Sequence, residues 1–219
     1  MRTIRVTGKG QIKVRPNMTR ITMTLDGLHR DYGETLRRSA EETETLKDAL
    51  SGFGFGRADL KTLSFSVDTE YENYQDQNGV YRQRFAGYRF RHVLKLEFES
   101  DNERLGRILY ALANCGVRAE FRISYTVKDP EAAKNLLLGN AVADAKDKAA
   151  VLSQAGGVSL REIQSIDYSW GEIDLEYRPM NGAVQAERCL SVSKAAFDMD
   201  IEPDDIEVSD TVTVVWEIA

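Results

Sequence analysis

The dipeptide Asn78-Gly79, set between two long stretches of alternating apolar and polar residues, constrains the fold of this chain more than any other feature. Asn-Gly is the strongest short signal for a β-hairpin, because a type I′ turn needs positive φ angles that these two residues accept. A two-residue turn also sets the register of the strands, and here it places Arg89 opposite Asp68. The chain on both sides of the turn is therefore predicted to form a long antiparallel pair.

The second strand of this hairpin contains YRQRFAGYRFRH, residues 81–92, in which four arginines alternate with aromatic side chains. Arginine and aromatic residues together are also typical of a nucleic-acid-binding surface. The predicted register puts the aromatic residues on one face and the arginines on the other, close to Asp68, Glu70 and Glu72. Arginines paired with acids bind phosphate poorly, and the net charge of −6 opposes a general nucleic-acid binder as well. Nucleic-acid binding is therefore the disfavoured interpretation.

Hydrophobic periodicity predicts an α+β fold of order ββαββαβαββ, with antiparallel-dominated sheets and helices packed on them. No Pro/Gly-rich linker divides the chain, so residues 1–219 are expected to form a single domain, with a long loop or excursion at 176–204. The expected strands are 2–15, 20–28, 60–71, the hairpin strand after Gly79, 117–127, 159–170 and 206–218, and the expected helices are 31–50, 100–115 and 130–155.

Capping signals and apolar stripes define the three expected helices. Asp31 with Glu34, and Ser100 with Glu103, resemble capping boxes, while Asp129-Pro130 is typical of an N-cap followed by proline. The buried stripe of the first helix is predicted to contain Leu36, Ala40, Thr43, Lys47 and Leu50, with Leu46 at its flank. The stripe of the third helix is rich in alanine, which would allow a close approach to a sheet, and is predicted to contain Leu138, Ala141, Val142, Ala145, Ala149 and Leu152.

Charge is unevenly distributed between the two ends of the chain. The first strand carries Arg2, Arg5, Lys9 and Lys13 without an acid, and the last part of the chain carries acids without a base, including Asp204, Asp205 and Glu207. The two ends could lie side by side in one sheet, or the basic end of one subunit could meet the acidic end of another. Two separate solvated edges are the third alternative.

No pattern of residues indicates catalysis, a metal site or a cofactor site. His29, His92, Cys115 and Cys189 lack the spacing of a zinc site, and two reduced thiols are the expected state of the cysteines. The glycine-rich SGFGFGR follows a helix and precedes a strand, which is the reverse of the order in a phosphate-binding loop. The acidic MDIEPDDIE does not match an EF-hand. The chain is therefore expected not to be an enzyme.

The hydropathy of the chain indicates the cellular compartment in which the protein is expected. The chain has no apolar run of about 18 residues that would span a membrane. The first residues alternate between apolar and polar and lack the apolar core of a secretion signal. We expect a cytoplasmic protein as the sequence stands, or an exported one if a leader has been removed.

Four segments in this order resemble the SIMPL-domain family: IRVTGKGQIKVRPNMTRITM, GYRFRHVLKLEF, AVADAKDKAAVLSQAGG and IEVSDTVTVVWEI, which together extend over residues 2–218. The resemblance implies an α+β fold that tends to self-assemble into large or ring-like oligomers. Members are linked with stress protection, cell-envelope antigens or signalling, many bacterial members are exported, and no catalytic residues are available to carry over. The resemblance therefore adds self-assembly to what the residues indicate.

Two classes of function follow from these observations. The leading hypothesis is a non-catalytic, self-assembling scaffold or stress-associated binding protein, whose partner is itself and whose assembly surfaces are the basic first strand, the acidic last strand and the 176–204 segment. The alternative is a module that binds a small molecule or peptide in an aromatic groove lined by Tyr71, Tyr74, Tyr81, Tyr168, Trp170 and Tyr177.

Overall fold

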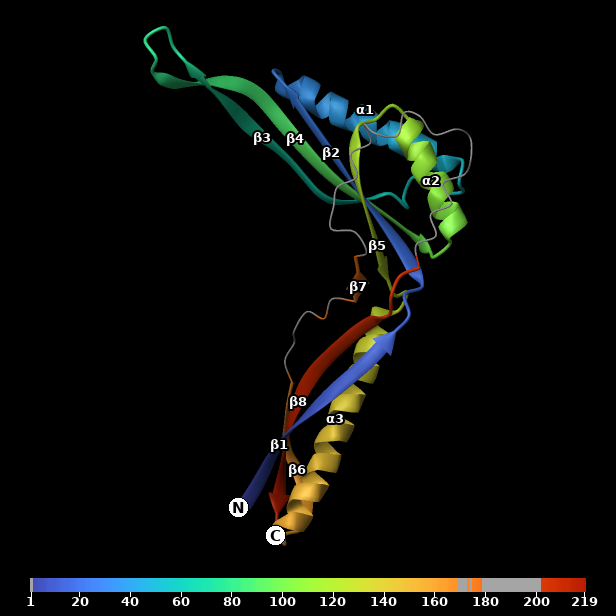
Figure 1. Ribbon diagram of the computed structural model, residues 1–219, viewed down its shortest axis with the longest axis vertical. Coiled ribbons are helices and arrows are strands. Elements are labelled where there is room, and N and C mark those ends of the chain that lie inside the picture. The colour runs from blue at the N-terminus through green and yellow to red at the C-terminus, as the bar shows by residue number, and fades with distance from the viewer. Residues whose placement is uncertain (1, 169–172, 174, 179–201) are drawn as a thin grey trace. The chain divides into compact units, whose positions relative to one another are not determined.

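The computed structural model describes residues 2–168, 173, 175–178 and 202–219. It confirms the α+β class and the predicted order of elements (Figure 1). The short strand β7 lies within the predicted 176–204 excursion, of which residues 179–201 are outside the described part of the chain. The elements are β1 (Arg2–Val14), β2 (Met18–His29), α1 (Tyr32–Ser51), β3 (Lys61–Gln75), β4 (Tyr81–Glu99), α2 (Asn102–Asn114), β5 (Ala119–Thr126), α3 (Pro130–Ala155), β6 (Leu160–Tyr168), β7 (Glu176–Tyr177) and β8 (Ile206–Ile218).

The chain divides into two compact units. The central unit is Met18–Tyr125, and the terminal unit combines Met1–Asn17, Thr126–Tyr177 and Pro203–Ala219. The terminal unit therefore brings the first and last strands of the chain into one sheet.

That sheet has the strand order β1-β8-β6 and is antiparallel. β1 and β8 pair along their whole lengths, from Arg2 opposite Ile218 to Val14 opposite Ile206. Helix α3 runs along one face of the sheet (Figure 1). The core between them consists of Val6, Val212, Val214 and Trp216 from the strands and of Ala141, Ala145 and Ala149 from the helix.

Two glycines of β1 allow α3 to lie very close to the sheet. A Cβ atom on Gly8 would stand 2.0 Å from the carbonyl oxygen of Ala141, and one on Gly10 would stand 2.1 Å from the carbonyl oxygen of Leu137. Real Cβ atoms do not approach carbonyl oxygens so closely, because their van der Waals surfaces would overlap. The predicted close approach of the alanine-rich stripe is confirmed, whereas the predicted burial of Leu152 is wrong, because this side chain is exposed and Ser153 is buried instead.

The central unit is built on an antiparallel sheet in which the strands follow the order β3-β4-β2-β5. Helix α1 contacts β2, β4 and α2. The fully buried side chains of the unit come from both sheet and helices and include Ile21, Met23, Leu25, Phe90, Leu94 and Leu96 from β2 and β4, and Leu46, Leu50, Leu105, Ile108 and Leu112 from α1 and α2.

Two details of the helices in this unit correct the prediction. The buried stripe of α1 contains Thr35, Ser39, Thr43, Leu46 and Leu50. Leu36 and Ala40 of the predicted stripe are exposed. Asp31 caps α1 as predicted and accepts a hydrogen bond from the backbone of Glu34 at 2.9 Å. The cap of α2 is Asp101 rather than Ser100, and it accepts from the backbone of Arg104 at 3.0 Å.

The hairpin loop also differs from the two-residue turn that Asn78-Gly79 predicts. Backbone hydrogen bonds from Asp76 to Val80 (2.9 Å) and from Gly79 to Asp76 (2.9 Å) enclose a three-residue loop, with Gly79 at a φ of +78°. This is the hairpin in which a glycine with positive φ follows a type I turn. A bulge at Ala86 then restores the predicted register, and Asp68 lies opposite Arg89.

Candidate functional site

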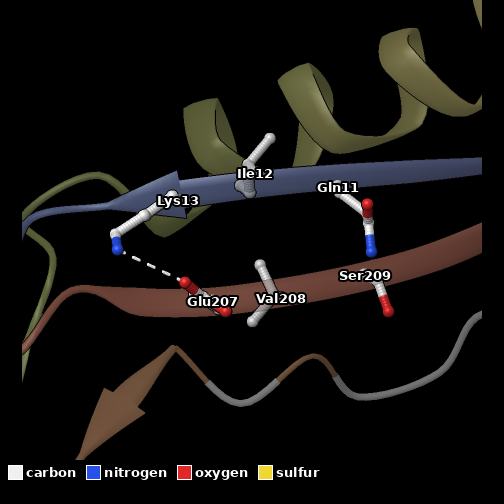
Figure 2. Close-up of a pocket in the computed structure, with 6 residues that line it drawn as sticks. All are labelled: Gln11, Ile12, Lys13, Glu207, Val208 and Ser209. Carbon is white, nitrogen blue, oxygen red and sulfur yellow. Dashed lines mark ion pairs between the residues drawn. The ribbon is translucent and has the colours of Figure 1, made fainter.

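The charged ends of the chain meet at the β1–β8 seam, which we define as the paired segments 11–13 and 207–209. Lys13 lies opposite Glu207, and its Nζ atom stands 3.3 Å from Glu207 Oε1 (Figure 2). The same Nζ atom stands 3.8 Å from Asp205 Oδ2. The hydrogen bond to Glu207 raises the pKa of Lys13. Of the three arrangements that the sequence left open, the structure shows the one in which the basic and acidic ends lie side by side in one sheet.

The other basic residues of β1 lie opposite uncharged partners. Arg2 faces Ile218, Arg5 faces Val215 and Lys9 faces Thr211. The backbone amide of Lys9 donates to Asp144 Oδ2 of α3 at 2.6 Å. Asp204 accepts a hydrogen bond from the backbone of Asp205. Of the seven charged residues predicted for assembly, the structure thus joins Lys13, Asp205 and Glu207 in ion pairs.

A hollow of about 470 Å³ opens at this seam and is lined by Gln11, Ile12, Lys13, Glu207, Val208 and Ser209 (Figure 2). Its polar side chains are an amide, a hydroxyl and one ion pair. A catalytic centre would need a nucleophile or base with a partner to activate it, and this lining supplies no such pair. Within the part of the chain that the structure describes, no group of three His, Cys, Asp or Glu side chains could hold a metal ion.

The β3–β4 hairpin of the central unit presents a very different surface. β2 pairs with β4 only as far as His29 opposite Tyr88. Beyond that point the hairpin consists of two strands and their loop, which we call the arm (Glu70–Gly87); Figure 1 shows it extending past β2 and α1. An isolated two-stranded hairpin has little stability in water, so a long arm of this kind needs further contacts.

One face of the arm carries exposed aromatic rings in contact with one another. Tyr71 is 56% exposed and Phe85 is 45% exposed, with their ring centroids 6.0 Å apart. Phe85 in turn lies 5.2 Å from Tyr88, which lies 5.4 Å from Tyr32 of α1, and all three contacts are edge-on. This face continues the sheet face that α1 covers, on which Phe90 is fully buried. The apolar face therefore extends beyond its helical cover.

The opposite face of the arm is charged. Arg84 pairs with Glu72 at 2.6 Å, and Arg89 contacts Asp26 of β2 at 2.5 Å and Glu70 at 3.6 Å. Asp68 lies opposite Arg89 in the register, but the guanidinium group of Arg89 makes its ion pairs with the other two acids. These arginines therefore have acidic partners within the chain.

The six aromatic residues predicted to line a groove are distributed over both units. Tyr71, Tyr74 and Tyr81 lie on the arm, and Tyr81 is 77% exposed. Tyr168 ends β6 and Tyr177 belongs to β7, both in the terminal unit. Trp170 is outside the described residues.

His92 lies where β4 meets β3 and α1. Its Nε2 atom is 2.9 Å from the hydroxyl of Thr62, and its Nδ1 atom is 3.2 Å from the hydroxyl of Thr43. Phe65 packs edge-on against the ring at 5.1 Å. Burial, and secondarily the positive charge of Lys47, lower the pKa of His92. Packing therefore favours the neutral form of the imidazole.

The cysteines show no reactive arrangement in the described part of the chain. Cys115 is half-buried at the end of α2, and its thiol donates to the carbonyl oxygen of Leu112 at 3.0 Å. Cys189 lies outside the described residues.

Comparison with known proteins bears out the resemblance to the SIMPL family. Residues 4–216 match the sequence model of SIMPL, described as a protein family of unknown function (DUF541). The chain belongs to the SIMPL family. The match covers both units, so the whole arrangement of strands and helices described above is that of one SIMPL chain.

Two relatives of this SIMPL protein are named 26 kDa periplasmic immunogenic protein, one from Brucella melitensis biotype 1 and one from Brucella abortus strain S19. Each is 24% identical over 215 residues, which cover 98% of this chain and 84% of the relative. Among the described residues, no helix is long and apolar enough to cross a membrane.

Sequence reasoning did not single out the exposure of the arm. Alternation correctly indicates which residues share a face, but it does not say whether another element covers that face. The length of the strands is the signal that could have indicated this exposure. The hairpin strands predicted around Asn78-Gly79 are longer than the strand at 20–28, so the ends of the hairpin have no third strand beside them.

Proposed function

We propose that this SIMPL protein acts without catalysis, as a self-assembling protein whose copies associate through the arm. The observation that carries the proposal is the exposed aromatic face of the arm, on Tyr71 and Phe85, which the described part of the chain leaves uncovered. Contiguous exposed apolar surface is typical of an interaction site. The two-stranded arm gains stability when a partner buries this face.

The free edge of β3 supports the same proposal. β3 is the outermost strand of its sheet and is 15 residues long. An exposed edge presents unpaired backbone N–H and C=O groups, which readily accept another strand. Proline, which blunts many natural edges, does not occur in β3.

The strand β1 is a second candidate edge for assembly. It is the outermost strand of the terminal sheet and carries Arg2, Arg5 and Lys9, whose charges have no acidic residue opposite them in β8. The contribution of Lys13, Asp205 and Glu207 to assembly is smaller in this proposal, because these residues already pair with one another within the chain.

The solution mass tests the proposal, measured by light scattering on a sizing column. We expect wild type to elute as an oligomer well above the 24.7 kDa of one chain, and the variant Tyr71→Ser/Phe85→Ser to have a lower mass. The control Leu136→Ser/Leu152→Ser removes two exposed leucines of α3 and should leave the mass unchanged. A wild-type monomer at micromolar concentration would overturn the proposal.

The location of the protein is inferred from its relatives. Both relatives are named periplasmic proteins, which favours export, the second of the two locations that the sequence allows, over the cytoplasm. Fractionation of cells that produce the protein from its complete gene should recover it with periplasmic markers. Recovery with cytoplasmic markers alone would overturn this inference.

A further inference from the structure

Helix α3 covers only part of the terminal sheet. Asn140 donates to the backbone carbonyl of Gln11 at 3.2 Å, and Asp144 accepts from the backbone amide of Lys9 at 2.6 Å. These bonds hold α3 over β1, which borders the sheet on one side, and the core contacts of the helix continue onto β8. β6 borders the sheet on the other side and has scarcely any contact with α3. The helix therefore does not cover β6.

The side of β6 that faces the same way as the α3 contact is apolar and exposed. Ile163 lies opposite Trp216 and Ile166 opposite Val214, and both partners belong to the core under α3. Facing residues of an antiparallel pair point to the same side of a sheet, and a register shift between Ile163 and Ser165 lets both isoleucines do so. Ile163 is 50% exposed and Ile166 is 47% exposed. Two large apolar side chains thus continue the core beyond its helical cover.

The backbone of β6 is free at the same place. β6 pairs with β8 on one side, and no strand of the described chain pairs with it on the other. A free edge offers unpaired N–H and C=O groups to a further strand, and β6 contains no proline that would blunt it. A helix cannot use these groups, because its own backbone is already hydrogen-bonded. The edge and the two isoleucines together therefore fit an extended segment.

The flank of α3 nearest to this surface carries a positive charge. Val142 and Lys146 are one turn apart and so share a flank of the helix, on which Val142 packs against the core. Asn140 and Asp144, which bond to β1, lie on the opposite flank. The flank of Lys146 therefore faces β8 and β6. Lys146 is exposed and makes no ion pair with any residue that the structure describes.

The acids of β6 are placed away from Lys146. Asp167 lies opposite Thr213, which alternates with the core residues of β8 and so points to the side of the sheet away from α3. Glu162 lines a hollow beside Glu217 at the start of β6. A segment bound along β6 on the α3 side would thus meet apolar side chains and a positive charge, which is complementary to a carboxylate.

We propose that β6 binds an extended acidic peptide segment of another protein, which adds to the terminal sheet as a fourth strand. Backbone hydrogen bonds join the segment to the free edge of β6. Apolar side chains at alternate positions of the segment cover Ile163 and Ile166, and a carboxylate on the same side pairs with Lys146. The site lies wholly within the terminal unit, so the inference does not depend on the self-assembly proposed for the arm.

A displayed library of random peptides tests the proposal. Selection on the immobilised full-length protein should enrich sequences that alternate apolar and polar residues and contain Asp or Glu. The Kd of a synthesised enriched peptide, measured by fluorescence anisotropy, should rise about tenfold for Ile163→Thr/Ile166→Thr and about tenfold for Lys146→Glu. Threonine keeps a high preference for strands, and all three positions are exposed, so both variants should remain folded.

Matched variants remove similar groups elsewhere. Leu136→Ser/Leu152→Ser removes two exposed leucines from the flank of α3 that carries Asn140, on the side of β1. Arg107→Glu reverses an exposed charge on α2 of the central unit. Both variants should bind the enriched peptide with the wild-type Kd, and circular dichroism checks the folding of every variant.

Backbone methylation of the peptide separates strand addition from apolar contact alone. Successive residues of an added strand direct their N–H groups alternately toward the neighbouring strand and away from it. Methylation of the backbone nitrogens at alternate positions should therefore abolish binding for one set of positions and leave the Kd unchanged for the other set. Equal effects of the two sets would overturn the addition of a strand.

Other outcomes would also overturn the proposal. The surface is not the site if no sequence is enriched, or if the enriched peptides bind Ile163→Thr/Ile166→Thr as tightly as wild type. An unchanged Kd for Lys146→Glu would exclude the acidic partner. If the isoleucine variant lowers the mass of a wild-type oligomer, a second copy of the chain occupies the surface instead of a peptide.

Discussion

At the residue scale, Gly8 and Gly10 decide how closely α3 approaches β1. Any side chain at these positions would enter the space of the α3 backbone at Ala141 and Leu137. A Cβ atom on Gly139, in α3 itself, would meet no atom within 4 Å, so this glycine has no such constraint. Glycine is needed in the strand and is only tolerated in the helix.

The variant Gly8→Ala should lower the free energy of unfolding by about 1–3 kcal/mol, because the methyl group overpacks the contact between α3 and β1. The matched variant Gly139→Ala should raise it by about 0.5–1 kcal/mol, because alanine is favoured in a helix interior. Urea unfolding followed by circular dichroism measures both. Equal effects of the two substitutions would contradict the close packing described for Gly8.

The ionisation of His92 is tied to the packing of the central unit. Its two ring nitrogens lie near hydroxyls of α1 and β3, and its lowered pKa is due first to burial and then to Lys47. The folded state thus binds a proton at His92 less readily than the unfolded state, in which the pKa of histidine is about 6.5. The contribution of His92 to the free energy of unfolding is therefore fully present above pH 6.5 and is lost as the pH falls below that value.

We expect His92→Gln to reduce the loss of unfolding free energy that wild type shows between pH 7.5 and about pH 5.5, since glutamine cannot bind the proton. The comparison is a difference of urea unfolding free energies at the two pH values. His29→Gln removes the other histidine and is the control. A change of equal size in both variants would contradict the assignment to His92.

At the element scale, helix α1 shows that hydrophobicity alone does not orient a helix. Thr43 and Leu50 are buried as the sequence predicts. Thr35 and Ser39 are buried in place of Leu36 and Ala40, which are exposed. The hydroxyl of Thr35 donates to the carbonyl of Asp31, and that of Thr43 donates to the carbonyl of Ser39. Because these hydroxyls are satisfied, the polar side chains can be buried at low cost.

Leucine-to-alanine substitutions on α1 test which face is buried. Leu46→Ala should lower the free energy of unfolding by about 2–5 kcal/mol, because it removes a fully buried side chain and leaves a cavity. Leu36→Ala should cost less than about 1 kcal/mol, because Leu36 is exposed. Thermal or urea unfolding measures the difference. A larger loss of unfolding free energy for Leu36→Ala than for Leu46→Ala would support the buried stripe predicted from the sequence instead.

The hairpin shows how a wrong turn and a right register can coexist. The loop contains one residue more than the Asn78-Gly79 signal predicts, which would shift every pair of facing residues. The bulge at Ala86 compensates for the shift, so Asp68 still faces Arg89. The apolar side chains of the two strands have to lie on the same face of the sheet. The extra residue in the loop shifts the register, and the extra residue at Ala86 shifts it back, so the apolar faces stay aligned.

At the scale of the whole molecule, basic residues of both sheets form ion pairs within the chain. Lys13 pairs with two acids at the β1–β8 seam, and Arg84 and Arg89 pair with acids of their own sheet. The net charge of −6 also opposes binding to phosphate groups. The arginine-rich strand β4 is therefore explained by the sheet rather than by a nucleic-acid ligand.

Labelled single-stranded and duplex DNA should show no saturable binding to the protein at about 150 mM salt, measured by fluorescence anisotropy. The variant Glu70→Lys/Glu72→Lys, which removes the acids beside Arg84 and Arg89, should gain weak binding that decreases as salt rises. Wild-type binding that weakens steeply with salt would contradict the explanation above.

Local patterns in the sequence were sufficient to predict the order of the elements and the faces of the hairpin strands. Alternation placed the strands, Asp31 and Asp129 marked helix starts by their capping position, and the alanines of α3 indicated a close contact. These features depend on interactions between residues near one another in the chain or on the spacing of apolar side chains, and both can be read from a single sequence.

Tertiary structure alone decided where each face is covered. It brought the basic first strand beside the acidic last strand, rotated α1 so that threonine and serine are buried, and ended β2 at His29 so that the aromatic face of the arm continues without a helix. These outcomes depend on the lengths of the elements and on which distant elements come into contact. Alternative contacts compete over the whole chain, and no local pattern in the sequence records the result. The proposed assembly surface arises from that competition, since it is the part of an apolar face that the described chain does not cover.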